Sequence, residues 1–446
     1  MKLFGTDGLR GKAGEFPLDA ASVRRLGREL GRRLAGSGPA RLVVGGDTRE
    51  STPRIVADMA AGLMEAGCNV ASAGVITTPG VAELVLELGA RAGVAVSASH
   101  NPYEDNGIKI FGPDGRKWPD AEEEYLENRL LEAADAPAEA SATPAPPDPD
   151  PGLVATYVSR LMASVPDDLE GFSVLLDAGN GAAFQIGPRA FRRCRAKVTA
   201  IYDAPDGRNI NRHCGALHPE GMARATRESG AALGVAFDGD ADRSIFADET
   251  GRILDGDDVL WIVARAWKAR GTLPPGGVVG TVMSNYGLEA GLAREGIAFQ
   301  RSAVGDRNVA RLMDETGAAL GGETSGHTLL APLSPAGDGI LTAMILSSIV
   351  KQSGKKLSEL ATLEKIPQTL RNVRVARRVP IDESPKIAEA VARAESGLRG
   401  RGRVFLRYSG TEPLLRILVE GPDAAEVKAV GDALEATVRA ELDGKP

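Results

Sequence analysis

The chain has 446 residues, too many for one ordinary hydrophobic core, so three or four domains are expected. A composition of 43% hydrophobic and 25% charged residues is typical of a globular protein in water. The 54 glycines and the low aromatic content of 4% fit an α/β fold with many short loops. The net charge of −7 argues against nucleic acid and anionic membrane as partners, because both require a basic face.

Cysteine usage and the N-terminal segment bear on compartment. Cys68, Cys194 and Cys214 have no CxxC spacing, so reduced thiols are expected rather than a disulfide framework. Residues 1–7 lack the apolar core of a signal peptide, and no apolar run reaches the roughly 18 residues of a membrane helix. These features predict a cytoplasmic protein, either a monomer or a homodimer.

Strand-length apolar runs alternate with helical patterns along the chain. Each run leads directly into a polar or glycine-rich turn, and one amphipathic helix is predicted over residues 53–66. The predicted strands are 42–44, 94–96, 173–176, 233–237, 278–279 and 404–408. This alternation predicts an α/β fold with mainly parallel sheets covered by helices. In such sheets ligands collect at the carboxyl ends of the strands, where the polar turns lie.

Composition also suggests where domains end. Residues 133–152 are rich in alanine and proline and are predicted to be a linker. Softer boundaries fall near residue 250 and at Pro367. The predicted domains are therefore 1–150, 151–250, 251–366 and 367–446, all of ordinary size.

Ser99 lies in a turn, residues 97–102, that directly follows a predicted strand. A free serine hydroxyl is a weak nucleophile, but a phosphorylated serine is a ready phosphoryl donor. The alternative is a plain polar turn in which Asn101 closes an Asx-turn and Pro102 ends the strand. A Ser-His-acid hydrolase is disfavoured, because Ser99 and His100 are adjacent and no GxSxG motif is present.

Asp238, Asp240 and Asp242 follow another predicted strand at a spacing of two, which on an extended segment places three carboxylates on one side. Such charges repel, so a cation is the natural partner, and ligation by oxygen alone favours Mg²⁺. One alternative is an EF-hand loop with Glu249 at its twelfth position, although Arg243 stands where that loop needs glycine. The other is a solvated acidic turn.

Two later loops combine glycines with polar groups. Residues 321–327 bring together Glu323, Ser325 and His327, which suit sugar hydroxyls and proton exchange, although a plain glycine-rich turn is an equal alternative. Residues 407–416 resemble an anion clamp built from hydroxyls, backbone N–H groups and arginines. That clamp is compatible with a hairpin turn between strands 404–408 and 415–419.

The remaining candidates are weaker in isolation. Residues 5–11 and 304–307 pair glycines with arginine, and Lys109 is either a site cation or an ordinary exposed lysine on a strand. His213 and His218 lack zinc-ligand spacing, so they are interpreted as structural or surface residues.

Four of these strings, in this order, resemble the α-D-phosphohexomutase superfamily over nearly the whole chain. Residues 4–11, 97–111, 205–211 and 218–220 are most similar to its bacterial subgroup that acts on glucosamine phosphates. The resemblance implies four domains around a central cleft, the first three related α/β domains with mixed sheets and the fourth a smaller α+β domain. In chain order these would be the phosphoserine, metal-binding, sugar-binding and phosphate-binding domains.

The resemblance also implies roles for residues. Ser99 would be phosphorylated and, with Asp238, Asp240 and Asp242, would bind one Mg²⁺ ion. Proton transfer and charge stabilisation would fall to Arg10, His100, Lys109, Arg243 and His327. The substrate-binding residues would be Glu323, Ser325, Gly305, Arg307, Arg407, Ser409, Gly410, Thr411 and Arg416.

Two positions depart from the superfamily pattern. Ala241 stands where glycine is usual, a change that is tolerated if its φ is negative. Thr324 stands where the glucosamine subgroup has glutamine and the mannose and glucose subgroup has methionine, which leaves the sugar preference open.

The implied reaction interconverts glucosamine 6-phosphate and glucosamine 1-phosphate through a bisphosphorylated sugar, a step toward UDP-N-acetylglucosamine. The small-molecule partner would then be a hexosamine phosphate. The nearest alternative is a mutase for mannose or glucose phosphates. A metal-dependent sugar phosphatase and a non-catalytic sugar-phosphate binder are the other two.

Overall fold

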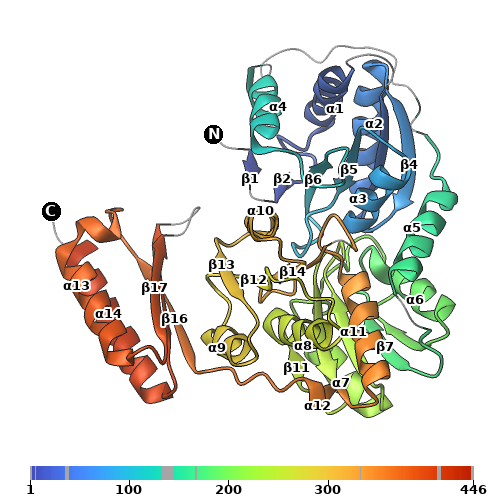
Figure 1. Ribbon diagram of the computed structural model, residues 1–446. Helices are drawn as coiled ribbons and strands as arrows, with labels where there is room; N and C mark the ends of the chain where they lie inside the picture. The colour runs from blue at the N-terminus through green and yellow to red at the C-terminus, as the bar shows by residue number, and fades with distance from the viewer. Residues whose placement is uncertain are drawn as a thin grey trace. The chain divides into compact units, whose positions relative to one another are not determined.

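The computed structural model describes residues 3–5, 7–35, 40–132, 145, 147–165, 168–331, 333–408 and 413–442. They form two compact units, one of Met1–Thr281 with Ser302–Thr362 and one of Val282–Arg301 with Leu363–Pro446. The first unit holds three sheets and the second holds a small one (Figure 1). The boundaries expected for the four domains stay predictions.

The first sheet has the order β1-β2-β6-β5-β3-β4. Its strands are β1 (Phe4–Gly5), β2 (Gly8–Lys12), β3 (Arg41–Gly46), β4 (Asn69–Val75), β5 (Ala92–Val96) and β6 (Asp105–Phe111). Its helices are α1 (Ala20–Leu34), α2 (Thr52–Glu65), α3 (Thr78–Glu87) and α4 (Asp120–Glu132).

Helices cover both faces of this sheet. Val94 packs into one apolar core with residues of α1, α2 and α4. The neighbouring Gly93 points to the opposite face, since side chains alternate along a strand. A Cβ on Gly93 would lie only 2.6–2.8 Å from side chains of Val81 and Val85, so glycine lets α3 approach that face closely.

The second sheet has the order β11-β10-β9-β7-β8. Its strands are β7 (Ser173–Asp177), β8 (Lys197–Ile201), β9 (Leu233–Phe237), β10 (Ser244–Asp248) and β11 (Ile253–Leu254). The helices that accompany it are α5 (Pro151–Ser164), α6 (Ala183–Arg193) and α7 (Glu220–Ser229). Met222 of α7 and Ala236 of β9 belong to one buried cluster on this sheet.

The third sheet pairs β14 (Leu320–Gly322) with β12 (Val278–Thr281) and β15 (Thr328–Leu330). Its region contains α8 (Gly256–Ala269), α10 (Asp306–Thr316), α11 (Gly339–Ser353) and α12 (Leu357–Leu360). The strand β13 (Phe299–Ser302) crosses the division between the two compact units.

The second unit contains an antiparallel sheet of order β16-β18-β17. Its elements are α9 (Tyr286–Arg294), β16 (Gln368–Arg374), a 3-10 turn (Ile381–Glu383), α13 (Pro385–Leu398), β17 (Arg403–Tyr408), β18 (Leu414–Glu420) and α14 (Ala424–Leu442). Val373, Ile417 and Val438 lie in its apolar core. The buried carboxylate of Glu420 pairs with Arg403 and accepts the Tyr286 N–H at 3.0 Å.

The structure corrects two expectations. The mixed sheets implied by the resemblance are confirmed, whereas the mainly parallel sheets expected from the alternation are not, because antiparallel strands extend the parallel pairs β3/β5 and β7/β9. The predicted linker is too long at its C-terminal end, since α5 begins at Pro151 behind the N-cap Asp150. Proline suits the first helical position, where its missing N–H has no partner to lose. Residues 133–144 and 146 of that linker lie outside the described residues.

Other expectations are confirmed. The predicted helix 53–66 is α2, the predicted strand 233–237 is β9, and strands β17 and β18 pair as an antiparallel hairpin. All three cysteines are free and buried. Within the described part of the chain, no helix is long and apolar enough to cross a membrane.

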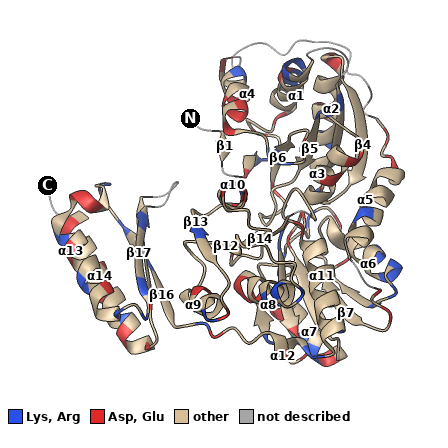
Figure 2. Cartoon of the chain, viewed as in Figure 1, with Lys and Arg blue, Asp and Glu red and all other residues tan. Residues whose placement is uncertain are grey.

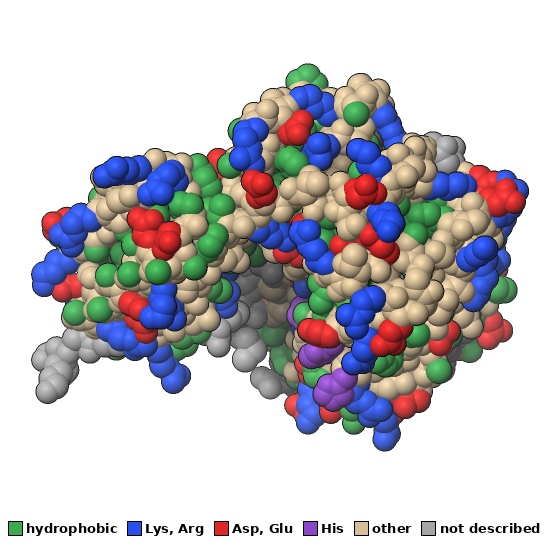
Figure 3. All heavy atoms as spheres, turned by 90° about the horizontal axis from the view of Figure 1, so that it is seen from below, with side chains coloured by type: hydrophobic (Ala, Val, Ile, Leu, Met, Phe, Trp, Pro, Cys, Tyr) green, Lys and Arg blue, Asp and Glu red, His purple; other side chains and the backbone are tan. Residues whose placement is uncertain are grey.

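Lys and Arg residues alternate with Asp and Glu residues along the helices and loops of the chain (Figure 2). On the face seen in Figure 3, Lys and Arg lie among Asp and Glu rather than in a patch of one sign. On that face the two signs of charge are therefore not segregated. The charged contacts that bear on the site lie in the buried loops described below.

Ala241 lies in the tight turn between β9 and β10, with φ at +56°. The negative φ that was the condition for tolerating alanine at this position is therefore not observed. A left-handed conformation costs an L-residue roughly 1–2 kcal/mol, which glycine avoids. The turn nevertheless keeps this conformation, and the Ala241 carbonyl accepts the Gly339 N–H at 2.9 Å.

We expect Ala241→Gly to be at least about 1 kcal/mol less destabilising than Ala236→Gly, because glycine relieves backbone strain only at position 241. Both alanines are fully buried, so each variant loses one buried methyl group. Urea unfolding of the two variants and the parent measures the difference. Equal losses of unfolding free energy would contradict this account of the turn.

Candidate active site

Ser99 lies in the turn of residues 97–102, here called the Ser99 loop, directly after β5. Its side chain is fully buried, and its Oγ donates a hydrogen bond to Asp238 Oδ2 at 2.6 Å. The two residues are 139 positions apart in sequence. The serine and the acidic motif singled out from the sequence therefore meet in the fold.

Asp238, Asp240 and Asp242 bring one carboxylate oxygen each within 4.8 Å of one another, and all three are buried. They converge through the tight turn after β9. The extended segment that their spacing predicted is not formed. The EF-hand alternative is wrong, because strands flank the loop and Glu249 instead accepts a hydrogen bond from the Ser358 backbone at 3.3 Å.

The donor set suits a hard divalent cation. Asp240 Oδ1 and Asp242 Oδ1 are buried and have no hydrogen-bond partner among the described residues. A buried carboxylate oxygen without a partner is costly, and a bound cation removes that cost. Three carboxylates near a serine oxygen match the ligands that Mg²⁺ prefers.

Lys109 is the buried counter-charge of this cluster. Its Nζ lies 2.9 Å from Asp240 Oδ2, 2.8 Å from Asp242 Oδ2 and 3.2 Å from Asp7 Oδ2. Burial acts to lower the pKa of Lys109, but the three carboxylates outweigh it and raise that pKa well above its usual value. The exposed-lysine alternative is wrong, since only 1% of the side chain is accessible.

The acids in the cluster differ in proton affinity. Burial, with the charges of Asp242 and Asp240, raises the pKa of Asp238 well above its usual value. Burial also acts on Asp242, but Lys109 and His327 hold the pKa of that carboxyl below its usual value. Asp238 is therefore the acid most in need of a cation or a hydrogen-bond donor when ionised.

His100 and Arg243 lie beside the serine. His100 Nδ1 is 3.3 Å from Ser99 Oγ, and Arg243 Nη1 is 3.5 Å from His100 Nδ1. Burial, together with Arg243 and Arg10, lowers the pKa of His100. The imidazole is thus held neutral at physiological pH and can accept a proton.

A chain of charges joins the first sheet to the third. Asp7 pairs with Arg10, and its Oδ1 lies 2.6 Å from Lys117 Nζ. The same ammonium lies 2.6 Å from Asp306 Oδ2, and His327 Nε2 lies 4.0 Å from that oxygen. Arg10 and His327, both expected at the site, are therefore linked through Asp7 and Asp306, which lie in loops that the sequence analysis named, and through Lys117, which it did not.

The glycine-rich loop after β14 meets the loop before α10. Glu323 is buried, and its Oε1 accepts the Gly305 N–H at 3.0 Å. Ser325 is exposed, whereas the Thr324 hydroxyl oxygen is buried without a hydrogen-bond partner among the residues described. Residues expected to bind the sugar thus come together, with a free polar atom beside them.

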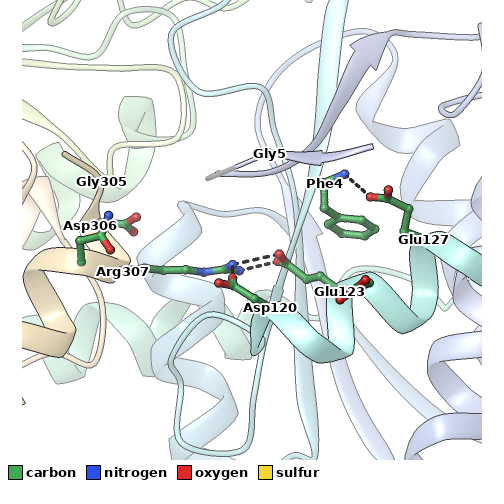
Figure 4. Close-up of a pocket in the computed structure, with 10 residues that line it drawn as sticks. Phe4, Gly5, Asp120, Glu123, Glu127, Gly305, Asp306 and Arg307 are labelled. Carbon is green, nitrogen blue, oxygen red and sulfur yellow. Dashed lines mark hydrogen bonds and ion pairs between the residues drawn. The ribbon is translucent and has the colours of Figure 1, made fainter. Parts of the chain in front are cut away.

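Arg307 turns toward helix α4 (Figure 4). Its guanidinium pairs with Asp120 and lies 3.0 Å from Glu123 Oε2, at a cavity of about 540 Å³. Phe4, Gly5, Gly305 and Asp306 also line this cavity. In this structure the charge of Arg307 is thus met by two carboxylates of α4, and its role toward a substrate stays a prediction.

In the second compact unit, Arg407 of β17 is paired directly across the sheet with Arg416 of β18. Like charges in opposite positions are destabilising, so an anion would be favoured there. Burial and the neighbouring Arg416 lower the pKa of Arg407. Ser409, Gly410 and Thr411 lie outside the described residues.

Sequence reasoning missed three buried or half-buried residues around these groups: Arg49, Lys117 and Asn211. Arg49 could have been found, because residues 47–49 directly follow β3 of the first sheet. Asn211 lies in residues 205–211, a string that carries the resemblance but did not indicate this role, and Lys117 carries no such signal. The contacts of both come from elements distant in sequence.

Family comparisons cover the chain in four segments. Models of phosphoglucomutase/phosphomannomutase alpha/beta/alpha domains I, II and III match residues 1–136, 155–251 and 255–366. The model of the C-terminal domain of the same family matches residues 370–437.

Curated relatives match over nearly their full length. Phosphoglucosamine mutase of Thermus thermophilus is 46% identical over 427 residues, 95% of each chain. Phosphoglucosamine mutase of Deinococcus deserti is 46% identical over 441 residues, 98% of each chain.

Solved structures share the fold. A phosphoglucomutase/phosphomannomutase family protein from Burkholderia thailandensis has a TM-score of 0.82 at 24% identity, covering 100% of this chain and 98% of its own. Aspergillus fumigatus N-acetylphosphoglucosamine mutase, solved with GlcNAc-6P and magnesium, has a TM-score of 0.64 at 19% identity, covering 98% and 96%. Taken with the four domain matches and the full-length relatives, this places the chain in the phosphoglucomutase/phosphomannomutase family.

Proposed function

We propose that the protein is a phosphoglucosamine mutase that interconverts glucosamine 6-phosphate and glucosamine 1-phosphate. The observation that carries the proposal is the buried Ser99 hydroxyl, hydrogen-bonded to an acid of the three-carboxylate cluster. Relatives of that name, 46% identical over almost the whole chain, support the choice of sugar. A mutase is an isomerase, so no net phosphate is released.

In the proposed cycle, Ser99 is phosphorylated at rest. The bond between phosphorus and Ser99 Oγ breaks as one forms to the free sugar hydroxyl, whose proton passes to a base. The resulting bisphosphorylated sugar turns around and returns its other phosphoryl group to Ser99 Oγ. The sugar oxygen released by this transfer takes the proton back from the base, which recovers the starting state. Such transfers depend mainly on positioning and on stabilising charge.

The chain's own residues divide this work. Lys109 stays protonated and, with Arg243 and Arg10, stabilises charge on the transferring group. His100, held neutral beside Ser99 Oγ, is the proposed proton acceptor, with His327 as the second candidate. Asp238, Asp240 and Asp242 would hold one Mg²⁺ ion, which neutralises phosphoryl oxygens when bound.

Substrate binding falls to the other loops. Glu323 and Ser325 would contact sugar hydroxyls, with Gly305 and Arg307 beside them. Arg407, Ser409, Gly410, Thr411 and Arg416 would hold the phosphate that does not react. The like-charged pair Arg407 and Arg416 supports this assignment, because a phosphate is attracted to two neighbouring guanidiniums.

Intact-mass measurement tests the phosphoserine. We expect the purified protein to carry one phosphate in part of the sample, and Ser99→Ala to carry none and to lose mutase activity by about three orders of magnitude or more. Ser159→Ala is the control, since that hydroxyl lies exposed on α5 and bonds only to the Ala155 carbonyl among the described residues. Equal mutase activity in Ser99→Ala would refute the mechanism.

Chelation tests the metal. EDTA should abolish mutase activity, and added Mg²⁺ should restore it. Mg²⁺ should also raise the thermal midpoint of the metal-free protein, because a ligand that binds only the folded state stabilises it. Asp240→Asn should lose that shift, whereas Asp248→Asn, outside the cluster, should keep it. An unchanged shift in Asp240→Asn would place the ion elsewhere.

Substrate comparison tests the sugar. We expect kcat/KM for glucosamine 6-phosphate to exceed those for mannose and glucose phosphates by about tenfold or more, the size of effect that one hydrogen-bonded group can give. A preference for mannose or glucose phosphates would identify the alternative mutase. Release of inorganic phosphate without isomerisation would instead indicate a phosphatase. If neither isomerisation nor phosphate release occurred, the protein would be a sugar-phosphate binder.

A further inference from the structure

The backbone of the Ser99 loop is held by two side chains from different sheets of the first unit. Arg49 Nη2 donates to the carbonyl oxygens of Ser99 at 3.1 Å and Asn101 at 2.7 Å. Asn211 Nδ2 donates to the same two oxygens, at 2.9 Å and 3.1 Å. Two donors thus converge on one pair of acceptors.

Arg49 is itself fixed. It is fully buried and ion-paired with Asp47, whose Oδ1 accepts the Arg49 N–H at 3.0 Å and the Thr52 hydroxyl at 2.9 Å. Its Nη1 lies 3.4 Å from Ser97 Oγ, which accepts the Ser99 N–H at 2.9 Å. A buried arginine with an ionised partner keeps its position, because moving it would leave a charge unpaired.

Asn211 arrives from the second sheet's side. It has φ at +58°, and its N–H donates to the Gly179 carbonyl at 2.8 Å. Gly239, within the acidic turn, leaves no room for a side chain, since a Cβ there would lie 2.5 Å from the Ser99 carbonyl oxygen and 3.0 Å from Asn211 Nδ2. The acidic turn and the Ser99 loop are therefore in direct contact at the point that Asn211 binds.

The contact matters because Ser99 has a strained backbone. Its φ of +53° lies in the left-handed region, which costs a residue with a side chain roughly 1–2 kcal/mol. Such conformations persist only where the surroundings fix them. The hydrogen bonds to the Ser99 carbonyl do so, and the resulting conformation points Oγ at Asp238.

We propose that Arg49 and Asn211 are positioning residues that hold Ser99 in this left-handed conformation and so aim its oxygen at the carboxylate cluster. The inference rests on the proposed function, in which that oxygen carries the phosphoryl group. In this structure both residues act through the loop backbone rather than on Oγ. One of the two donors comes from the side of the first sheet and the other from the side of the second sheet. Arg49 and Asn211, here called the backbone clamp, therefore also fix the position of Ser99 relative to the acids that it must face.

The test is Asn211→Ala, with Asn209→Ala as its matched control. Asn209 lies in the same segment, but its side chain bonds to the Ala204 carbonyl and the Asp206 N–H rather than to the Ser99 loop. We expect Asn211→Ala to lower kcat by about 10- to 100-fold, the scale of a misplaced reacting group, with KM within about threefold. Asn209→Ala should stay within about twofold of the parent in kcat.

A crystal structure of Asn211→Ala adds a readout independent of turnover, in which the φ of Ser99 should leave the left-handed region. Arg49→Lys keeps a charge beside Asp47 but loses the planar fork, so a folded variant should show the same kcat loss. If the parent is active and Asn211→Ala keeps the parental kcat, or raises only KM, the positioning role of Arg49 and Asn211 is refuted while the proposed function stands. A parent without mutase activity would overturn the proposed function.

Discussion

The site depends on one constraint, which is the placement of three buried carboxylates close to one another. Unpaired, they would repel one another and lose their hydration, at a cost of several kcal/mol per ion. Lys109 meets two of them and Arg243 lies beside them, yet two oxygens remain without a hydrogen-bond partner among the described residues. The cluster therefore keeps negative charge that suits a cation.

Mixed sheets make this arrangement reachable. The antiparallel strand β6 lies beside β5, with Lys109 opposite Ala95, so the ammonium reaches the acids from the strand next to the one that leads into the Ser99 loop. In the second sheet, β10 returns antiparallel to β9 and closes the acidic turn. A purely parallel sheet would need a long crossover at each of these points.

The sequence was sufficient for features that depend on local order. Ser99 and the three aspartates follow apolar strands, and strand ends are where α/β proteins place ligands. It was insufficient where the outcome depends on distant partners. Nothing near Lys109 reveals that three acids would surround it, and nothing near Asn211 reveals that it binds the Ser99 loop. The left-handed φ of Ala241 is likewise imposed by the tight turn rather than by that residue's own preference.

The hydrogen bond from Ser99 to Asp238 links the two halves of the proposed chemistry. Only an unmodified hydroxyl has the proton that Asp238 accepts at 2.6 Å. If Oγ carried a phosphoryl group, that proton would be gone and Asp238 would lie beside a second anion. The two anions would repel each other unless a bound cation offset their charge. The phosphorylated form should therefore require the metal more strongly than the unmodified one, which ties the resting state of the serine to the occupancy of the acidic cluster.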